Sequence, residues 1–374
     1  MPPRPSSRKP QPRAQDPANS KSGSSLAARF ADAMRMAGAI WPGVVAVSGG
    51  SDSLGLMYLL RDWAKAARLP LPVVLCVDHR LRPGSEGEAR QVLGWAKQAG
   101  LRGKLLTNSG ETPRADVEAA ARDVRYRLMG KWAVSNGFKA IYVGHTRDDQ
   151  AETFLLRLAR GSGVDGLSAM RAVASYPVPQ FSQLSLVRPL LGMEREALRD
   201  DLNARGQEWL DDPMNADPRF ARVKIRNAWP ALEAAGLGKE RIADAAGHLA
   251  RAREALDAVT EAVLARACRI DGDVMVLDPL ALASAPRELG LRALAHVLMA
   301  VSKNPYRPRF ERLERLFDLI GTGMLGAGRT LHGCRIAPAP KARAVFGIGS
   351  LLVVCEEIRP KDKKNKEQGS RRAF

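Results

Sequence analysis

Cysteine is scarce in this sequence of 374 residues, and none of the four cysteines stands at a spacing that metal sites or redox motifs use. There is no Cys-x-x-Cys pair, so neither a zinc site nor a thioredoxin-like motif is predicted. Free thiols in a reducing cytoplasm are the expected state. Cys76 lies within an apolar run and is expected to be a core residue.

Long apolar runs are also missing. No stretch approaches the roughly 20 apolar residues that span a bilayer, and the first residues are Pro, Arg, Ser and Lys without an apolar segment. This start does not match a secretory signal peptide, and its prolines disfavour an amphipathic transit peptide. We therefore expect a cytoplasmic protein without membrane contact. No feature of the sequence points to a protein partner.

Positive charge is abundant, with a formal net charge of +18, which suggests a polyanionic partner. Residues 2–24 supply a net +4 and residues 359–374 a net +5, so the two ends carry half of the excess. We expect residues 1–24 and 359–374 to be disordered basic tails. The chain between them keeps an excess near +9, which fits a nucleic-acid substrate.

The stretch at residues 44–53 predicts a phosphate-binding turn. Four small apolar residues predict a buried strand, and the leucines from Leu54 onward have helical spacing. Between them stands a Ser-Gly-Gly-Ser-Asp-Ser turn, in which glycines permit close approach and the helix start offers unpaired N–H groups. It lacks the Gly-Lys-Ser/Thr ending of a P-loop and hence a lysine for a γ-phosphate. The expected phosphate cradle consists of Ser48, Gly49, Gly50, Ser51, Asp52 and Ser53.

An ordinary glycine-rich turn between strand and helix is the alternative interpretation. The Ser-Gly-Gly tripeptide alone would leave the two about equal. Asp52 and Ser53, with a strand before and a helix after, favour phosphate binding.

Polar residues also follow the apolar runs at 73–77 and 140–144. Strands of an open α/β sheet bind ligands at their carboxyl ends, so residues 78–82 and 145–153 are candidates. In the second segment, His145 and Asp149 are four residues apart, and Asp149 and Glu152 are three apart. Several of these groups can thus face one ligand. The alternative, acids that favour a helix start, explains Asp149 but not His145 or Glu152.

Two further groups of cations are candidates for binding phosphates. A helix is predicted over 116–135, and its Arg122 and Arg125 share one face; a solvated stripe is the alternative. Beyond two Asp-rich turns at 211–218, cations occupy every second position, at Arg222, Lys224 and Arg226. They suit an RNA backbone or a plain surface helix.

The rest of the sequence predicts helices followed by strands. Helices are expected over 239–270, 287–301 and 309–320 with a strand at 274–277, and an antiparallel meander over 329–336, 342–348 and 351–355. The predicted fold class is α/β: a doubly wound parallel sheet, then a helical domain and a small antiparallel β region. The expected boundaries are 25–232 for the catalytic domain, 233–303 for the helical domain and 304–358 for the helix with the meander.

Taken together, these motifs resemble a known family. The hexapeptide Ser48–Ser53 is typical of PP-loop ATP pyrophosphatases, which cleave ATP between the α- and β-phosphates. Over roughly residues 40–230 the order of motifs resembles that of tRNA(Ile)-lysidine synthases. The motifs that carry this resemblance are Ser48–Ser53, Asp78–Arg82, Arg122 with Arg125 and Tyr126, His145–Thr153, Arg160–Gly163, Arg188–Leu190, and Asp212–Pro213 with Asn215.

The resemblance implies three substrates: ATP, L-lysine and an isoleucine tRNA with a CAU anticodon. It also implies that the C2 oxygen of the wobble cytidine attacks the α-phosphorus and that the lysine ε-amine then displaces AMP. It further implies that Asp52 binds Mg²⁺ and that Arg122 binds a phosphate. Asp149 and Glu152 would bind the ammonium groups of lysine. His145 is expected to be catalytic. The rear domains of the family grip tRNA.

Three alternative functions are weighed against this one. A tRNA thiolase of the same superfamily needs a cysteine pair or an iron–sulfur cluster, and the predicted catalytic domain has only Cys76. A small-molecule amidating synthetase such as NAD synthetase would not require a basic rear domain. A non-enzymatic RNA-binding protein with a relic loop would not retain Asp52, His145, Asp149 and Glu152.

Overall fold

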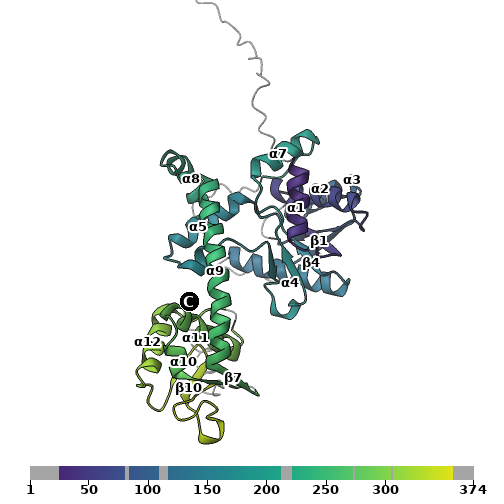
Figure 1. Ribbon diagram of the computed structural model, residues 1–374. Helices are drawn as coiled ribbons and strands as arrows, with labels where there is room; N and C mark the ends of the chain where they lie inside the picture. Colours follow the sequence, from purple (N-terminus) through teal and green to yellow (C-terminus); the bar gives the residue numbers. More distant parts are fainter. Residues whose placement is uncertain are drawn as a thin grey trace, which may run out of the picture. The chain divides into compact units, whose positions relative to one another are not determined.

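The computed structural model describes residues 25–80, 84–108, 117–211, 221–272, 274–304 and 306–356. The chain divides into two compact units, the first ending at Gly247 and the second beginning at His248 (Figure 1). This division lies within helix α9 (Lys239–Ala267), whereas the sequence suggested boundaries at 232 and 303. The two tails and the Asp212–Pro213–Asn215 motif fall outside the described residues.

A six-stranded sheet forms the centre of the first unit, in the order β3-β2-β1-β4-β6-β5. All neighbouring strands pair in parallel except β5 and β6, which are antiparallel. The apolar runs at 44–47, 73–77 and 140–144 therefore supply neighbouring strands of a largely parallel sheet. The strands are β1 (Gly43–Ala46), β2 (Val73–Asp78), β3 (Gly103–Thr107), β4 (Ala140–Tyr142), β5 (Val173–Ser175) and β6 (Ser185–Val187).

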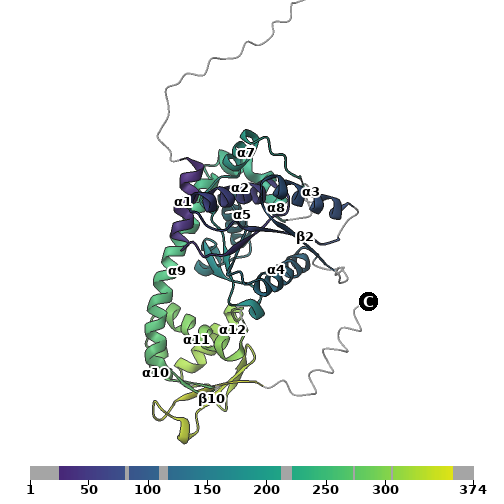
Figure 2. The ribbon, with the colours of Figure 1, turned by 90° about the vertical axis from the view of Figure 1, so that its right-hand side faces the viewer.

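Helices cover both faces of this sheet, as the predicted doubly wound fold requires. Apolar side chains of α1, α2, α3 and α7 pack on one face, and those of α4 pack on the other. Figure 2 shows α2 and α3 on the opposite side of the sheet from α4. The helices of this unit are α1 (Leu26–Met36), α2 (Ser51–Ala66), α3 (Ser85–Gln98), α4 (Val117–Ser135), α5 (Arg147–Leu158), α6 (Val164–Leu167), α7 (Arg195–Ala204) and α8 (Ala221–Ala234).

The sheet order creates a crevice beside β1. After β1 the chain continues to β2 on one side, and after β4 it continues to β5 and β6 on the other side. The connections after β1 and β4 therefore lead in opposite directions at a topological switch point, where such sheets bind ligands. Gly144 brings the two loops together, because a Cβ there would lie only 2.9 Å from the carbonyl oxygen of Asp52. The motifs at 48–53 and 145–153 consequently meet, as the sequence predicted.

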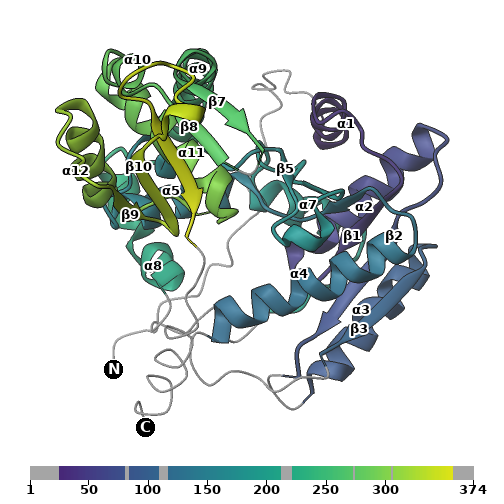
Figure 3. The ribbon, with the colours of Figure 1, turned by 90° about the horizontal axis from the view of Figure 1, so that it is seen from below.

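The second unit contains an antiparallel five-stranded sheet in the order β7-β8-β11-β10-β9 (Figure 3). One face of the sheet packs on the helices, and side chains of α11 supply much of the shared apolar core. The strands are β7 (Cys268–Asp271), β8 (Val274–Leu277), β9 (Arg329–Leu331), β10 (Cys334–Pro338) and β11 (Leu351–Cys355), and the helices after α9 are α10 (Pro279–Ala283), α11 (Arg287–Ser302) and α12 (Phe310–Gly321).

Two details of the predicted meander are wrong. The run 329–336 is not one strand, because His332 and Gly333 form a two-residue turn with φ angles of 57° and 74°, the positive values that tight hairpins need. The run 342–348 is not a strand either. It contains the end of a 3₁₀ turn, Lys341–Arg343, followed by further turns, and β11 pairs directly with β10 instead. Residues 239–270 were expected to form one long or two short helices; 239–267 form the single helix α9, and the last three residues belong to β7 instead.

Within the described ranges, no helix combines the length and the apolar character that crossing a bilayer requires.

Candidate active site

The turn after β1 has the form of a phosphate cradle. Helix α2 begins at Ser51 with Gly50 at its N-cap, so the N–H groups of the first turn point out of the helix start. The Ser48 N–H donates to the Ser53 hydroxyl oxygen at 3.2 Å, and that hydroxyl donates to the Gly50 carbonyl at 2.9 Å. A Cβ at Gly50 would meet, among the described atoms, only the Ser48 hydroxyl oxygen, at 4.0 Å. The backbone at Gly50 is therefore accessible to a ligand.

The facing segment begins α5 with a capping box. Asp149 Oδ2 accepts from the Thr146 N–H at 2.8 Å and from the Thr146 hydroxyl at 3.0 Å, and the Thr146 hydroxyl oxygen accepts in turn from the Asp149 N–H at 3.4 Å. The helix-start interpretation of Asp149 is thus partly right. The other oxygen, Oδ1, faces Arg195 at 3.5 Å, so the same carboxylate also belongs to the crevice.

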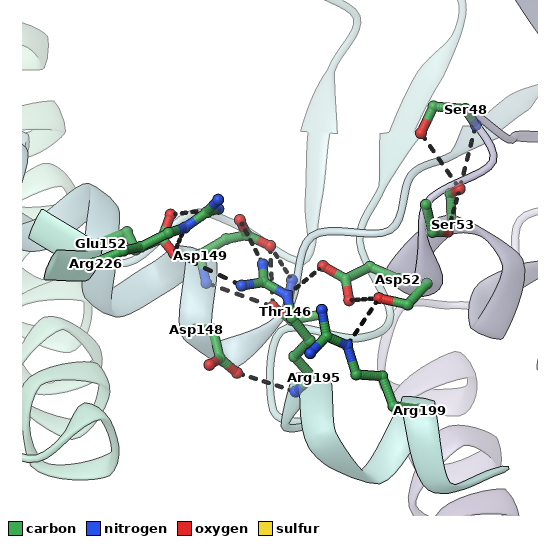
Figure 4. Close-up of polar contacts among 12 residues, drawn as sticks. Ser48, Asp52, Ser53, Thr146, Asp148, Asp149, Glu152, Arg195, Arg199 and Arg226 are labelled. Atoms are coloured by element: carbon green, nitrogen blue, oxygen red, sulfur yellow. Dashed lines mark hydrogen bonds and ion pairs between the residues drawn. The ribbon is translucent and has the colours of Figure 1, made fainter. Parts of the chain in front are cut away.

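Arg195, at the first position of α7, joins the two halves of the site (Figure 4). Its Nε lies 2.9 Å from Asp52 Oδ2, its Nη2 3.5 Å from Asp149 Oδ1, and its Nη1 3.7 Å from Glu152 Oε1. The structure therefore brings together the three carboxylates that the sequence singled out. It does so around a guanidinium that sequence reasoning missed.

A signal for Arg195 was present in the sequence. It follows the short apolar run at 186–187, which lies in β6, and β6 pairs in parallel with β4. The segment after β6 therefore emerges at the same edge of the sheet as the other two motifs.

Burial and charge act in opposite directions on this group. Burial raises the pKa of Asp52 above its usual value of 3.8, and the charges of Asp149 and Asp148 add to this effect, whereas Arg195 lowers it. Burial alone would lower the pKa of Arg195, but the carboxylates around it, Asp52 first, raise it above its usual value. Arg195 is therefore a permanent cation, and Asp52 takes up a proton at a higher pH than an ordinary aspartate does.

Two more cations hold the outer carboxylates. Arg226 on α8 binds both oxygens of Glu152, at 2.7 and 3.1 Å, in the two-pronged geometry that arginine forms with carboxylates. Asp148 accepts from the Arg195 backbone N–H at 3.0 Å and from the Lys239 ammonium at 2.9 Å. Burial would raise the pKa of Asp148, but these two hydrogen bonds bring it below its usual value.

The three cations at every second position do not form a row. They belong to α8, where residues two apart point to nearly opposite sides and residues four apart share a face. Arg222 and Arg226 therefore share one face. Lys224 is exposed on the other.

A group of three arginines lies near His145. The charges of Arg188, Arg122 and Arg222 all act on its imidazole, and Arg122 also stacks on the Tyr126 ring at 4.9 Å. Burial lowers the pKa of His145 to about 4, helped by the three arginines and opposed by Asp149. Its Nδ1 is buried without a hydrogen-bond partner within the described part of the chain. The sequence had placed Arg122 and His145 in the site but not with each other.

We expect the imidazole of His145 to stay neutral between about pH 5 and 8, where an ordinary histidine titrates. Histidine ring signals followed by NMR during a pH titration would show this, with assignment from the spectrum of the His145→Asn variant. The assigned signal should move with a midpoint near pH 4. A midpoint near pH 6.5 would contradict the buried, cation-flanked environment.

A cleft of about 1050 Å³ within the first unit is lined by Glu152 and Arg195 of this group. Acidic residues outnumber basic ones on its wall, and two tryptophans also line it. Arg199 lies over Trp209 and Lys239 over Trp229, at 5.8 and 5.6 Å from the ring centres. The acidic residues are Asp148, Glu152, Glu194, Glu196, Asp200, Glu233 and Glu240. Several of these acids pair with cations of the same wall, so the wall keeps only a small acidic excess, which favours a cationic small molecule.

Comparison with known proteins identifies the family. Residues 32–232 match the family described as PP-loop domain. The chain is 40% identical over 300 residues to a tRNA(Ile)-lysidine synthase of Ruegeria pomeroyi, covering 78% of this chain and 70% of that protein. The chain belongs to the tRNA(Ile)-lysidine synthase family. A member from a Bradyrhizobium species is 38% identical over 328 residues, covering 80% of this chain and 90% of the relative.

Family membership confirms the predicted resemblance and fold class. The tRNA(Ile)-lysidine synthases match well beyond the PP-loop domain, since the aligned share of this chain reaches 80%. A solved structure of a U34-tRNA thiolase from Methanococcus maripaludis is similar over 60% of this chain and 78% of that chain, at 16% identity and a TM-score of 0.48.

Proposed function

We propose that this chain joins L-lysine to C2 of the wobble cytidine in a CAU-anticodon isoleucine tRNA, using ATP and forming AMP and pyrophosphate. The observation that carries the proposal is the crevice at the switch point of the sheet. There Asp52 of an ATP-binding PP-loop shares Arg195 with Asp149 and Glu152, next to a cleft lined by Glu152, in a chain 40% identical to a tRNA(Ile)-lysidine synthase.

Two displacement steps make up the reaction. The C2 oxygen of cytidine attacks the α-phosphorus of ATP, an O–P bond forms, and the bond to pyrophosphate breaks. The ε-amine of lysine then attacks C2, the C–N bond forms, and the C2–O bond breaks as AMP leaves with the oxygen; the amine proton passes to solvent. A carbonyl oxygen leaves poorly as oxide and well as a phosphate ester, which is why ATP is required.

The nucleotide half of the site lies on the PP-loop. The N–H groups at the start of α2 and the hydroxyls of Ser48, Ser51 and Ser53 would hold the pyrophosphate portion of ATP, as helix starts commonly hold phosphates. Arg122 and Arg188, which both act on His145, would face the α-phosphate. Such positioned donors stabilise the charge that develops during transfer. A neutral His145 serves there as a hydrogen-bonding group, because a pKa near 4 makes it a weak base.

Asp52 is the residue that we assign to Mg²⁺. No group of three or more His, Cys, Asp or Glu side chains within the described ranges is arranged to hold a metal. This fits Mg²⁺ with ATP, because that ion commonly takes one or two carboxylates and completes its shell with phosphates and water. Bound there, the ion would neutralise the leaving pyrophosphate.

The lysine half of the site uses Asp149 and Glu152. Both are buried and adjoin the acidic cleft, with Glu152 on its wall. In the structure the Glu152 carboxylate is bound by Arg226, whose side chain is 33% exposed. An incoming lysine ammonium would share this carboxylate with Arg226 or displace the Arg226 guanidinium from it. Lys224, exposed on the other face of α8, remains the residue that we assign to the tRNA backbone.

The nucleotide products of ATP cleavage provide the first test. With ATP, lysine and total bacterial tRNA, the enzyme should release AMP and pyrophosphate and put labelled lysine into RNA, since the loop has no lysine for a γ-phosphate. Thin-layer separation of α-labelled nucleotides distinguishes AMP from ADP. ADP as the main product would contradict the proposed reaction.

Substitution of the lysine-side carboxylates is the second test. Asp149→Asn and Glu152→Gln each remove one charge-assisted contact, worth on the order of 1.5–3 kcal/mol. The KM for lysine should therefore rise roughly ten- to a hundredfold, with the KM for ATP little changed. Asp123→Asn is the matched control, because its exposed carboxylate on α4 pairs only with Arg127 among the described contacts. A defect confined to ATP would move both residues to the nucleotide side.

The first unit does not provide the reactive thiol that the alternative thiolase activity would need. Cys76 lies in β2, and burial raises its pKa to about 12, so it holds almost no reactive thiolate at neutral pH. A small-molecule amidating synthetase would cleave ATP with its own small substrate and would not need tRNA. The labelled-lysine assay separates these activities, because only lysidine synthesis puts the label into RNA.

A further inference from the structure

Two of the four cysteines face each other in the second unit. Cys334 is the first residue of β10 and Cys355 the last of β11, and they are direct partners in the antiparallel register. Their neighbours Gly333 and Glu356 also face each other, and the Glu356 N–H donates to the Gly333 carbonyl at 2.7 Å. Hydrogen-bonded and non-hydrogen-bonded pairs alternate along an antiparallel ladder. Cys334 and Cys355 thus form a non-hydrogen-bonded pair.

The far end of the ladder agrees with this assignment. The Ala339 N–H donates to the Ser350 carbonyl at 2.8 Å, and this pair is six positions along from Gly333 and Glu356. An even separation keeps both pairs in the hydrogen-bonded class, so the register is consistent throughout.

This geometry suits a disulfide. Facing residues in a non-hydrogen-bonded pair have Cα atoms about 4.5 Å apart, inside the range of about 4.4 to 6.8 Å that disulfides span. Their side chains also lie on the same side of the sheet. Cys268, on β7, faces Leu277 instead, so it offers an internal comparison within the same sheet.

The two thiols differ in accessibility. Cys334 is fully buried, and its Sγ donates to the Leu298 carbonyl on α11 at 3.3 Å. Burial raises the pKa of Cys334 to about 11, and the nearby Cys355 adds to this effect. Cys355 is exposed at the strand end. An oxidant therefore reaches Cys355 first, and Cys334 is the nearby thiol that can react with the product.

We infer that Cys334 and Cys355 are a peroxide-sensitive pair that closes to a reversible cross-strand disulfide. The Cys355 thiolate attacks hydrogen peroxide, an S–O bond forms, the O–O bond breaks, and hydroxide leaves as water after taking a proton. The sulfur of Cys334 then attacks the sulfenic acid, the S–S bond forms, and the S–O bond breaks with loss of a second water. Two thiols are oxidised and one peroxide is reduced. A dithiol reverses the change.

The crosslink would fix the two ends of residues 334–355, which include the long connection between β10 and β11. A bond that closes this loop restricts the unfolded chain. The oxidised second unit should therefore melt at a higher temperature than the reduced one.

Peptide mapping of the full-length chain tests the pair. After treatment with hydrogen peroxide and alkylation of free thiols, mass spectrometry of a non-reduced digest should find Cys334 linked to Cys355 in most of the oxidised protein. The linked peptide should be about 2 Da lighter than the two thiols together and should separate with dithiothreitol. Cys355→Ser should abolish it, and Cys268→Ser should leave it unchanged. Because Cys355 is exposed, its variant should fold and keep basal lysidine formation.

Three outcomes would overturn the inference. One is Cys355 oxidised to sulfinic acid in the wild-type chain while Cys334 stays a free thiol. The second is a link from Cys355 to Cys268 or to a second copy of the chain. The third is a Cys334–Cys355 link found to the same extent in untreated protein and resistant to dithiothreitol, which would make it a permanent structural bond.

Discussion

Replacing Asp52 by asparagine should lower the rate of lysidine formation by about a hundredfold or more, while tRNA binding stays within about twofold of wild type. Asparagine keeps the size of the side chain but removes the charge that pairs with Arg195 at 2.9 Å and that we assign to Mg²⁺. Steady-state rates with labelled lysine, together with filter binding of tRNA, measure the two quantities separately. Raising the Mg²⁺ concentration should restore part of the rate.

Asp62→Asn is the matched control for this substitution. Asp62 lies on the same helix and also pairs with arginines, Arg61 and Arg205, but it is remote from the crevice residues. Its substitution should leave the rate within about twofold of wild type, as surface ion pairs contribute little. If Asp52→Asn behaved like Asp62→Asn, Asp52 would not be the metal-side carboxylate.

The sheet and its crevice could be predicted from the sequence because each motif follows an apolar strand. The strands before Ser48 and before His145 are short, buried and rich in β-branched residues, and parallel strands bring their carboxyl ends to one edge. Those two facts placed Asp52 near Asp149 without any knowledge of contacts. The sequence could not show that Asp149 divides its two oxygens between a helix cap and Arg195, because that depends on side-chain orientation.

The contacts made by α8 show a second limit. Three cations at alternate positions look like a row, but a helix turns about 100° per residue, so Arg226 faces Glu152 while Lys224 faces away. From the sequence, Arg222, Lys224 and Arg226 could belong either to an RNA-binding stretch or to a plain surface helix. Local periodicity does not decide which buried carboxylate a cation will meet.

One misassigned strand concealed the cysteine pair in the second unit. In a meander with a strand at 342–348, that strand would separate the ones that carry Cys334 and Cys355. The residues at 342–348 include Gly347, whose φ of 84° disfavours a strand at that point. With that segment in turns, β10 and β11 become neighbours. The pairing of β10 with β11 therefore brings together two cysteines that cysteine spacing alone could not connect.

Substitution of Arg195 by alanine should have the largest effect on both activity and stability. It removes the guanidinium that lies between Asp52, Asp149 and Glu152. The Arg195 side chain is 20% exposed, so these carboxylates would be left largely buried with less compensation, which costs on the order of 3–5 kcal/mol of unfolding free energy. We expect the rate of lysidine formation to fall by about a thousandfold. Denaturant unfolding of the chain and steady-state rates measure the two effects.

The pH dependence of the rate distinguishes an effect on Asp52 from a purely structural role of Arg195. Burial raises the pKa of Asp52 and Arg195 lowers it, so removing Arg195 should raise that pKa further. If the ionised form of Asp52 is the active one, the acidic limb of the rate profile must move to higher pH in Arg195→Ala and move less in Arg195→Lys, which retains a charge. Arg205→Ala is the control, because Arg205 follows the same helix and pairs with Asp201 and Asp62. A slow Arg195→Ala enzyme whose acidic limb stays in place would assign Arg195 to the fold rather than to Asp52.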